Sequence, residues 1–167
     1  MVIWMPLGET RTDLSRDQVH AFVRAQFGSG LRRAGISAEF TLATAAAAWG
    51  GLHPAPEAPC LALIFTSRTF TGTETAACLA DLRAGTLPMP FQFVASQPHL
   101  AAAHALGLFP GLDQVVTLVG PAGDVDALLP ALARRRAWTH VLLGEVWTPA
   151  PKSGDRFLAN WQVRVRG

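Results

Sequence analysis

One continuous stretch contains signals for a strand, a turn and a helix. It consists of Gln114–Val119 (QVVTLV), Gly120–Gly123 (GPAG) and Asp124–Arg136 (DVDALLPALARRR). The first segment is a short apolar run typical of a buried strand. The Gly and Pro residues after it indicate a tight turn, and the last segment has the apolar spacing of a helix. In open α/β sheets, the turn at the carboxyl end of a strand is where nucleophiles and ligands are placed.

The turn itself carries no catalytic chemistry. Its four residues are Gly120, Pro121, Ala122 and Gly123. None of them offers a nucleophile, a base or a metal ligand. The sequence also lacks a G-x-G-x-x-G or P-loop pattern, and Asp124 and Asp126 would repel a bound anion while suiting the helix dipole. The stretch therefore predicts the geometry of an active site without its reactive groups.

Composition points to a single domain over residues 1–167. Half of the 167 residues are hydrophobic, which is enough to bury a sizeable core without disulfides. Charged residues make up 16% and the net charge is +2, so the protein has no field that would favour nucleic acid. The first residues lack the basic and apolar regions of a signal peptide, and no apolar run is long enough to span a bilayer. We expect a cytoplasmic protein.

The cysteines and histidines do not predict a metal or cofactor site. Cys60 lies in an apolar run and Cys78 in a helical one, without metal spacing, so both are interpreted as packed thiols of a reducing compartment. The histidines are scattered and have no carboxylate or thiol pattern beside them. No cofactor is expected.

The rest of the chain alternates between strands and helices. Expected strands cover 2–7, 60–66, 114–119, 140–146 and 156–166, and expected helices cover 15–27, 40–49, 71–83, 96–106 and 124–136. This order predicts a three-layer α/β/α fold with a largely parallel sheet. Cys60–Thr66 is unbroken and apolar, as in a central strand covered on both faces. Residues 156–166 alternate with a period of two, which is typical of a half-exposed edge strand.

Local signals fix several element ends. Ser15 with Gln18, and Thr71 with Glu74, have the form of capping boxes. The segment 87–94 (LPMPFQFV) is expected to be extended, because a residue before proline is pushed out of the helical region. Ser96 is expected to cap the helix that follows it.

Two further groups of residues are candidate sites. Ser96 and His99 lie three residues apart and could meet across a helical turn, which would suit a weak hydrolase. Capping is the better interpretation of Ser96, because no G-x-S-x-G elbow surrounds it. The basic patch Arg134, Arg135 and Arg136 ends a helix, where cations are stabilised anyway. It could also dock an acidic partner.

Several ordered pieces of the chain together suggest a family. They are ALIFTSR (62–68), TETAACLADLRAG (73–85), LPMPFQFVASQPHLAAAHAL (87–106), QVVTLVGPAGDVDALLPAL (114–132) and HVLLGEVW (140–147). In order and pattern this segment resembles the N-terminal half of the β-ketoacyl synthases, which have a thiolase-like fold. The likeness is greatest to the divergent synthase-like domains found beside aryl-polyene and xanthomonadin-type pigment genes.

The resemblance also implies what is missing. In that family the catalytic cysteine occupies the turn before the helix, where this chain has Gly120–Gly123, and no cysteine follows Cys78. The two family histidines belong to a second half that this sequence does not contain. A decarboxylating condensation needs the thiolate and those histidines. The resemblance thus implies a non-catalytic half-ketosynthase, an accessory or chain-length-factor-like partner in a fatty acid or polyene pathway.

Association is expected along one strand. In the family this strand lies at the sheet edge and pairs with its counterpart in a second subunit. Its residues here are Gln114, Val115, Val116, Thr117, Leu118 and Val119. They contain none of the Lys, Pro or charge that blunts an exposed edge. Pro90, Phe91 and Phe93 would add apolar area beside it.

We expect a homodimer or a heterodimer with a ketosynthase, and an acyl carrier protein is a further partner that the resemblance implies. Three alternatives remain: a small acyl- or aromatic-binding module, a weak hydrolase using Ser96 and His99, and a decayed structural homodimer.

Overall fold

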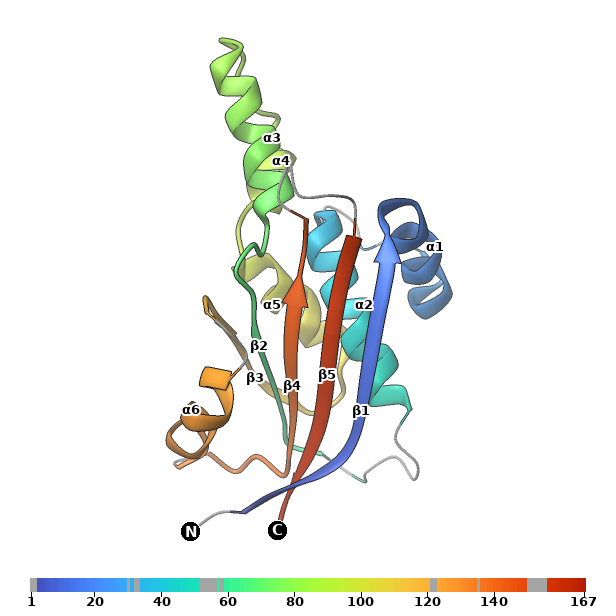
Figure 1. The fold of residues 1–167 in the computed structure, drawn as a ribbon, viewed down its shortest axis with the longest axis vertical. Helices are drawn as coiled ribbons and strands as arrows, with labels where there is room; N and C mark the ends of the chain where they lie inside the picture. The colour runs from blue at the N-terminus through green and yellow to red at the C-terminus, as the bar shows by residue number, and fades with distance from the viewer. Residues whose placement is uncertain are drawn as a thin grey trace.

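A computed structural model of the chain describes residues 3–29, 31, 34–51, 57, 59–120, 123–134, 136–149 and 156–167 (Figure 1). The strands are β1 (Trp4–Ser15), β2 (Leu61–Thr66), β3 (Leu112–Leu118), β4 (His140–Trp147) and β5 (Arg156–Arg166). The helices are α1 (Arg16–Phe27), α2 (Ile36–Gly50), α3 (Gly72–Arg83), α4 (Pro90–Ala95), α5 (His99–Leu108) and α6 (Gly123–Ala133).

The five strands form one mixed sheet in the order β1-β5-β4-β2-β3. β2 pairs in parallel with both β3 and β4, whereas β5 is antiparallel to β4 and to β1. The central place predicted for β2 is confirmed, and all of its residues are buried. The expected α/β fold is confirmed too, although only the β2–β3 and β2–β4 pairs of the sheet are parallel.

The prediction that the C-terminal strand lies at an edge is wrong. Its period-two alternation is present, with Phe157, Ala159, Trp161 and Val163 buried. However, β1 pairs with β5 along its whole length and takes the edge position. The first strand is longer than the predicted 2–7, because Pro6 and Gly8 are tolerated at an edge, where a register shift between them absorbs an extra residue.

One face of the sheet carries the larger core. Helices α1, α2 and α5 lie behind the strands in Figure 1 and pack against side chains such as Phe65, Leu142 and Trp161. The Ala-rich helix α2 contributes Ala43, Ala45 and Ala48 to this core. Its Thr44 hydroxyl also accepts a hydrogen bond from the Trp161 indole N–H at 2.8 Å, so the polar atom of the largest core side chain is satisfied.

The other face is covered only in part. Val125, Leu129 and Ala133 of α6 pack on Ala62 and Ile64 of β2, together with neighbouring side chains of β4. This third layer confirms the three-layer arrangement. Over β1 and β5 the same face carries mostly polar side chains.

Helix ends follow the local signals in some places and not in others. The α1 start is as predicted: the Gln18 side chain accepts a hydrogen bond from the Ser15 N–H at 2.8 Å, and Gly28 ends the helix in the left-handed region. The extended conformation predicted for 87–94 is wrong from Pro90 onward, since Pro90 opens α4. Proline suits the first helical position, where its missing N–H costs nothing.

Two capping predictions are also wrong. Ser96 does not cap α5, which begins at His99; its hydroxyl instead donates to the Phe93 carbonyl at 2.7 Å and closes α4. Thr71 has a φ of 59° and its side chain does not cap α3. The Glu74 carboxylate does not bond back to Thr71 either, because it is taken up by Ser37 of α2.

Candidate functional site

β3 lies at the edge of the sheet, as predicted. One side of it pairs with β2, with Ala62 opposite Gln114 and Ile64 opposite Val116. No described strand lies on its other side. An open edge presents a row of unpaired backbone N–H and C=O groups, which is a template for another chain.

The side chains of β3 are divided between the two faces of the sheet. Val115 packs against the α2 and α5 side, while Val116 and Leu118 pack against the α6 side. Thr117 and Gln114 are half-buried. Val119, directly after the strand, is 89% exposed. The free edge is thus short, largely apolar and uncharged after Asp113.

The turn between β3 and α6 is only partly described. Gly120 is half-buried, Pro121 and Ala122 lie outside the described residues, and α6 begins at Gly123. On the first turn of α6, the Asp126 carboxylate pairs with the Arg164 guanidinium of β5 at 2.6 Å. This ion pair anchors the start of the helix on the sheet.

The apolar residues predicted to flank β3 lie on α4. Pro90, Phe91 and Phe93 are exposed in this short helix, which packs against α3. Together α3 and α4 form a projection, here called the arm (Gly72–Ala95), that extends past the end of the sheet at which β2 finishes (Figure 1).

The root of the arm is fixed by bonds that the sequence did not reveal. Glu74 accepts hydrogen bonds from the Ser37 backbone N–H and from the Ser37 hydroxyl, both at 2.8 Å. The carboxylate thereby caps the amino end of α2, where the helix dipole favours negative charge. Gly35 leaves room for this carboxylate, because a Cβ atom at this residue would lie 2.5 Å from Glu74 Oε1 and displace the side chain. No local motif could have signalled a partner 37 positions away.

A buried carboxylate lies one turn further along α2. Glu39 is 8% exposed. Burial raises its pKa above the usual range, while the hydrogen bond from the Leu31 N–H at 2.8 Å and the nearby His20 act in the opposite direction. The His20 Nδ1 lies 3.8 Å from the carboxylate, which links α1 to α2.

The arm also borders an apolar cavity of about 250 Å³. Its walls come from the amino end of α2 and from the first turns of α3 and α4. The apolar part of the lining consists of Ala34, Gly35, Ile36, Ala77, Phe91 and Ala95. Glu74 closes one side, with its carboxylate already engaged by Ser37.

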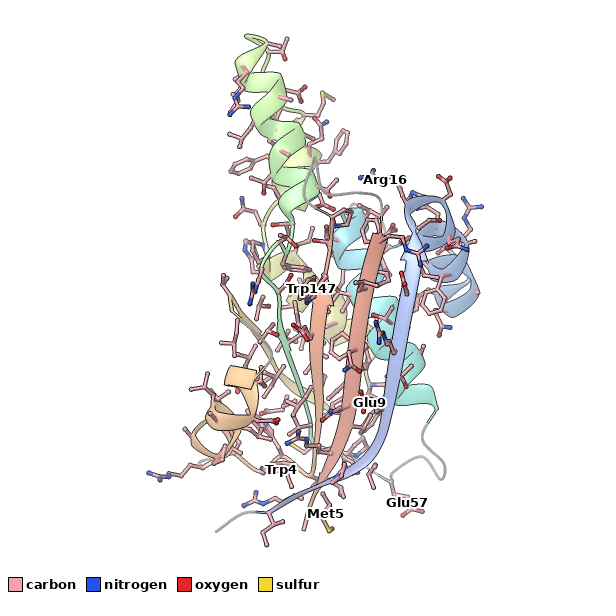
Figure 2. All side chains as sticks on the ribbon, viewed as in Figure 1. Trp4, Met5, Glu9, Arg16, Glu57 and Trp147 are labelled. Carbon is pink, nitrogen blue, oxygen red and sulfur yellow. The ribbon has the colours of Figure 1, made fainter. Side chains whose placement is uncertain are left out.

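The partly uncovered face of the sheet holds a second hollow, of about 350 Å³, between β1, β5 and β4. Glu9 and Trp147, both labelled in Figure 2, line it together with Arg11, Glu145 and Asn160. The Trp147 indole N–H donates to Glu145 at 2.9 Å. Mixed charges of this kind are typical of an antiparallel ribbon that faces water.

The remaining predicted residues lie apart from one another. His99 is exposed at the start of α5, and the Ser96 hydroxyl is engaged by the Phe93 carbonyl. Arg134 and Arg136 are exposed after the end of α6, and Arg135 lies outside the described residues. The Arg136 carbonyl accepts a hydrogen bond from Arg166 at 3.1 Å.

Neither thiol lies at the β3–α6 turn. Cys78 is buried within α3. Cys60 is only partly buried and lies directly before β2, one residue outside the strand that was predicted over 60–66. Within the part of the chain that the structure describes, no three His, Cys, Asp or Glu side chains gather as metal ligands would. None of the helices described is both long and apolar enough to cross a membrane.

Comparison with known proteins gives structural neighbours only. No family model matches the sequence, and no curated protein sequence matches it significantly. The fold is similar to a chain of the ketosynthase (ApeO) in complex with its chain length factor (ApeC) from Xenorhabdus doucetiae. That match has a TM-score of 0.66 at 11% identity and covers 98% of this chain and 79% of the other.

Two further structures are longer than this chain. The ishigamide ketosynthase/chain length factor matches with a TM-score of 0.54 and 13% identity, over 86% of this chain and 47% of its own. The 3-oxoacyl-(acyl carrier protein) synthase III of Pseudomonas aeruginosa PAO1 has a TM-score of 0.44 and 20% identity, over 98% and 52%. The chain spans about half the length of these two proteins. The first two structures share the α/β fold of this chain.

Proposed function

We propose that the chain, acting as one domain over residues 1–167, is a non-catalytic partner of a condensing enzyme. It associates through the open edge of β3, with its own copy or with a ketosynthase, in a fatty acid or polyene pathway. The role is that of an accessory or chain-length-factor-like subunit. The observation that supports it best is the open, uncharged edge at 114–119 on a fold similar to that of a ketosynthase in complex with its chain length factor.

The edge supports association because nothing on it opposes pairing. Gln114–Val119 contains no Lys, Pro or charged residue, and its backbone groups on the outer side have no partner strand among the described residues. Proteins that keep such an edge solvent-exposed usually blunt it. A second strand laid along β3 would satisfy these groups and extend the sheet.

The fold likeness supports the identity of the partner. One of the similar structures is a ketosynthase bound to its chain length factor, and another is a ketosynthase/chain length factor. We extend that arrangement to this chain: a condensing enzyme supplies the catalysis and this chain supplies a matching surface. An acyl carrier protein would then deliver the acyl groups to the enzyme rather than to this chain.

The positions of the thiols support a non-catalytic role. Condensation by a ketosynthase needs a thiolate that carries the acyl group. The only cysteines are Cys60, before β2, and Cys78, inside α3. Both lie away from the β3–α6 turn, so we expect the isolated protein to form no carbon–carbon bond from malonyl and acyl thioesters.

The test is co-expression with a ketosynthase encoded nearby in the same genome, followed by size-exclusion chromatography and a condensation assay. We expect a 1:1 complex that condenses, from which Val119→Lys releases this chain. Val119 is the better probe, because Val116 and Leu118 pack against the α6 side and Lys there would unfold the protein. Leu7→Lys, on an exposed residue of β1, is the matched control.

Two results would overturn the proposal. One is condensation by the isolated chain that Cys60→Ala or Cys78→Ala abolishes. The other is a protein that stays monomeric at high concentration and binds none of the ketosynthases encoded at its locus.

A second candidate function is supported by the cavity at the base of the arm. Its volume of about 250 Å³ and its small apolar lining residues suit an aliphatic or aromatic group. Titration with a neutral environment-sensitive dye should show saturable binding that Ala77→Trp abolishes. The hydrolase alternative has no comparable support, because the Ser96 hydroxyl donates to a backbone carbonyl.

A further inference from the structure

The partly uncovered face of the sheet collects buried polar atoms that have no partner. Five buried side-chain nitrogen or oxygen atoms lack a hydrogen bond in the described part of the chain, and three of them lie on β1 and β5. They are Trp4 Nε1, Asn160 Oδ1 and Arg164 Nε. Such atoms are rare in folded proteins, because a buried polar group without a partner costs stability. Their grouping on one face indicates a ligand that supplies the missing bonds.

Two hollows follow β5 on this face. The first, of about 350 Å³, is lined by Trp147 and Asn160. The second, of about 630 Å³, is lined by Trp4 and Arg164. Glu9 lines both of them, and in Figure 2 it lies between the two labelled tryptophans along the sheet. Together they form a groove about 20 Å long, here called the β5 groove, with a tryptophan and an unpartnered polar atom in each half.

Trp147 is held in place although its ring is 46% exposed. Its indole N–H donates to Glu145 at 2.9 Å, and Leu158 lies opposite it on β5. Leu158 is half-buried and also lines the first hollow. A fixed aromatic ring beside an aliphatic side chain suits a ligand that has an apolar face.

The charged groups around the first hollow carry both signs. Arg11 of β1 and Glu145 of β4 lie on opposite sides of Asn160, and Glu9 lies beside Arg11. None of these three charged residues forms an ion pair with a described residue. Mixed charges alone would mark only a solvated surface, but here they surround a buried acceptor. A ligand with a net charge of either sign would meet groups of its own sign, so the site favours a neutral ligand.

We infer that the β5 groove binds a neutral oligosaccharide. A hydroxyl group both donates and accepts hydrogen bonds, so one type of group satisfies the Asn160 oxygen as well as the Trp4 and Arg164 nitrogens. A sugar ring also has an apolar C–H face, which packs on an indole ring. The strand face of a small β-barrel binds oligosaccharides in the same manner in an unrelated fold.

An extended peptide fits this groove less well. Peptides that are recognised by a sheet add to an open edge through backbone hydrogen bonds. The backbone of β5 is already paired on both sides, with β1 and with β4. A peptide over β5 would therefore find side chains only.

The groove is separate from the proposed partner edge, because β3 lies at the other end of the strand order. The inference goes beyond the proposed function and is independent of it.

The first experiment is a printed array of neutral and acidic glycans, followed by isothermal titration of the full chain with the neutral oligosaccharide that binds best. We expect saturable binding that Trp147→Ala weakens by at least about tenfold. Leu106→Ala, on an exposed residue of α5 behind the opposite face, is the matched control. It should change the dissociation constant by less than about twofold.

A second variant separates a binding role of Asn160 from a structural one. Asn160→Leu removes the unpartnered oxygen and nearly keeps the shape of the side chain, so the melting temperature should stay the same or rise. The affinity for the oligosaccharide should fall by at least about tenfold. A lower melting temperature with unchanged affinity would make Asn160 a structural residue and overturn the inference.

Three further results would overturn it. The first is a wild-type protein that binds no neutral glycan on the array. The second is binding that is confined to acidic glycans or is lost in about 0.5 M salt, because screening of that kind identifies a charged ligand. The third is binding of extended peptides in place of sugars.

Discussion

The two edges of the sheet differ in almost every feature that controls strand pairing. β1 has twelve residues, contains Pro6, shifts register beside it and carries Glu9, Arg11 and Asp13. β3 has seven residues, contains no proline and has no charge after Asp113. Val119, directly after β3, is nearly fully exposed.

The difference indicates which edge faces water. Proline, a register shift and alternating charges are devices that natural sheets use to prevent edge-to-edge pairing. They gather on β1 and are lacking on β3 after Asp113. In the proposed function β3 is covered by a partner, so selection against pairing would act on β1 only.

The largest effect on the free energy of unfolding is expected at the centre of the sheet. A Cβ atom on Gly144 of β4 would meet the Trp161 ring at 2.3–2.6 Å. Both residues are buried between neighbouring strands, so the ring has no room to move. Gly144→Val should lower the free energy of unfolding by about 3 kcal/mol, which is the upper part of the range for overpacked cores. Urea denaturation measures it, and a loss below about 1 kcal/mol would contradict the packing described.

Replacing the charged residues of β1 should make its edge as open to strand pairing as the edge of β3. In the triple variant Glu9→Thr, Arg11→Thr, Asp13→Thr, the outer edge loses its charges and gains a residue that favours strands. We expect association beyond the dimer, visible in light scattering as at least about a tenfold fall in the concentration at which large species form.

An equal loss of charge elsewhere is the control for this variant. Asp17→Asn, Arg24→Gln and Glu57→Gln change exposed residues outside the sheet. They should leave the scattering unchanged. If both triple variants associate equally, net charge and not the edge governs association, and the comparison of β1 with β3 loses its meaning.

A smaller effect on stability is expected from a substitution at the root of the arm. Glu74→Ala removes both acceptors of Ser37 and leaves the amino end of α2 uncapped, which should lower the free energy of unfolding by about 1–2 kcal/mol. Amide exchange over 72–95 should become faster. Thr75→Ala, at the exposed neighbouring position, should change neither, and Glu74→Gln should restore part of the loss. Unchanged exchange in Glu74→Ala would show that the bonds to Ser37 do not position the arm.

The smallest effect is expected from the buried Glu39, between α1 and α2. Burial raises its pKa in the folded state, despite the Leu31 N–H and His20, and Glu74 adds in the same direction. Because the pKa of Glu39 is higher in the folded state than in the unfolded chain, its protonated form favours folding. The contribution to stability is complete when the pH is below the pKa of the unfolded chain, and it is lost as the pH rises through the pKa of the folded state. Glu39→Gln should therefore raise the melting temperature slightly at pH 7 and lose this advantage below the ordinary glutamate pKa. Melting curves at both pH values measure it, and a gain that grows on acidification would contradict the assigned direction.

Local patterns in the sequence were sufficient for several features. The unbroken apolar run before Ser67 specified a strand covered on both faces, and β2 occupies that position. Gln18 three residues after Ser15 started α1, and the period of two in residues 156–166 gave the buried face of β5. These features depend on residues within a few positions of each other, where backbone geometry alone decides what can form.

The position of β5 in the sheet and the partner of Glu74 depend on contacts between residues far apart in the sequence. The place of β5 inside the sheet depends on β1, more than 140 positions earlier in the sequence, which runs through Pro6 and Gly8 to pair with it. Glu74 had a plausible local partner in Thr71 but bonds to Ser37, because packing brings the start of α3 to the amino end of α2. Local patterns placed most strands and helices, with α4 and the length of β1 as exceptions, and the residues at 120–123 include no nucleophile. Which edge stays open, and where the arm projects, follow from long-range pairing, which local propensity does not encode because contacts distant in sequence choose between competing local states.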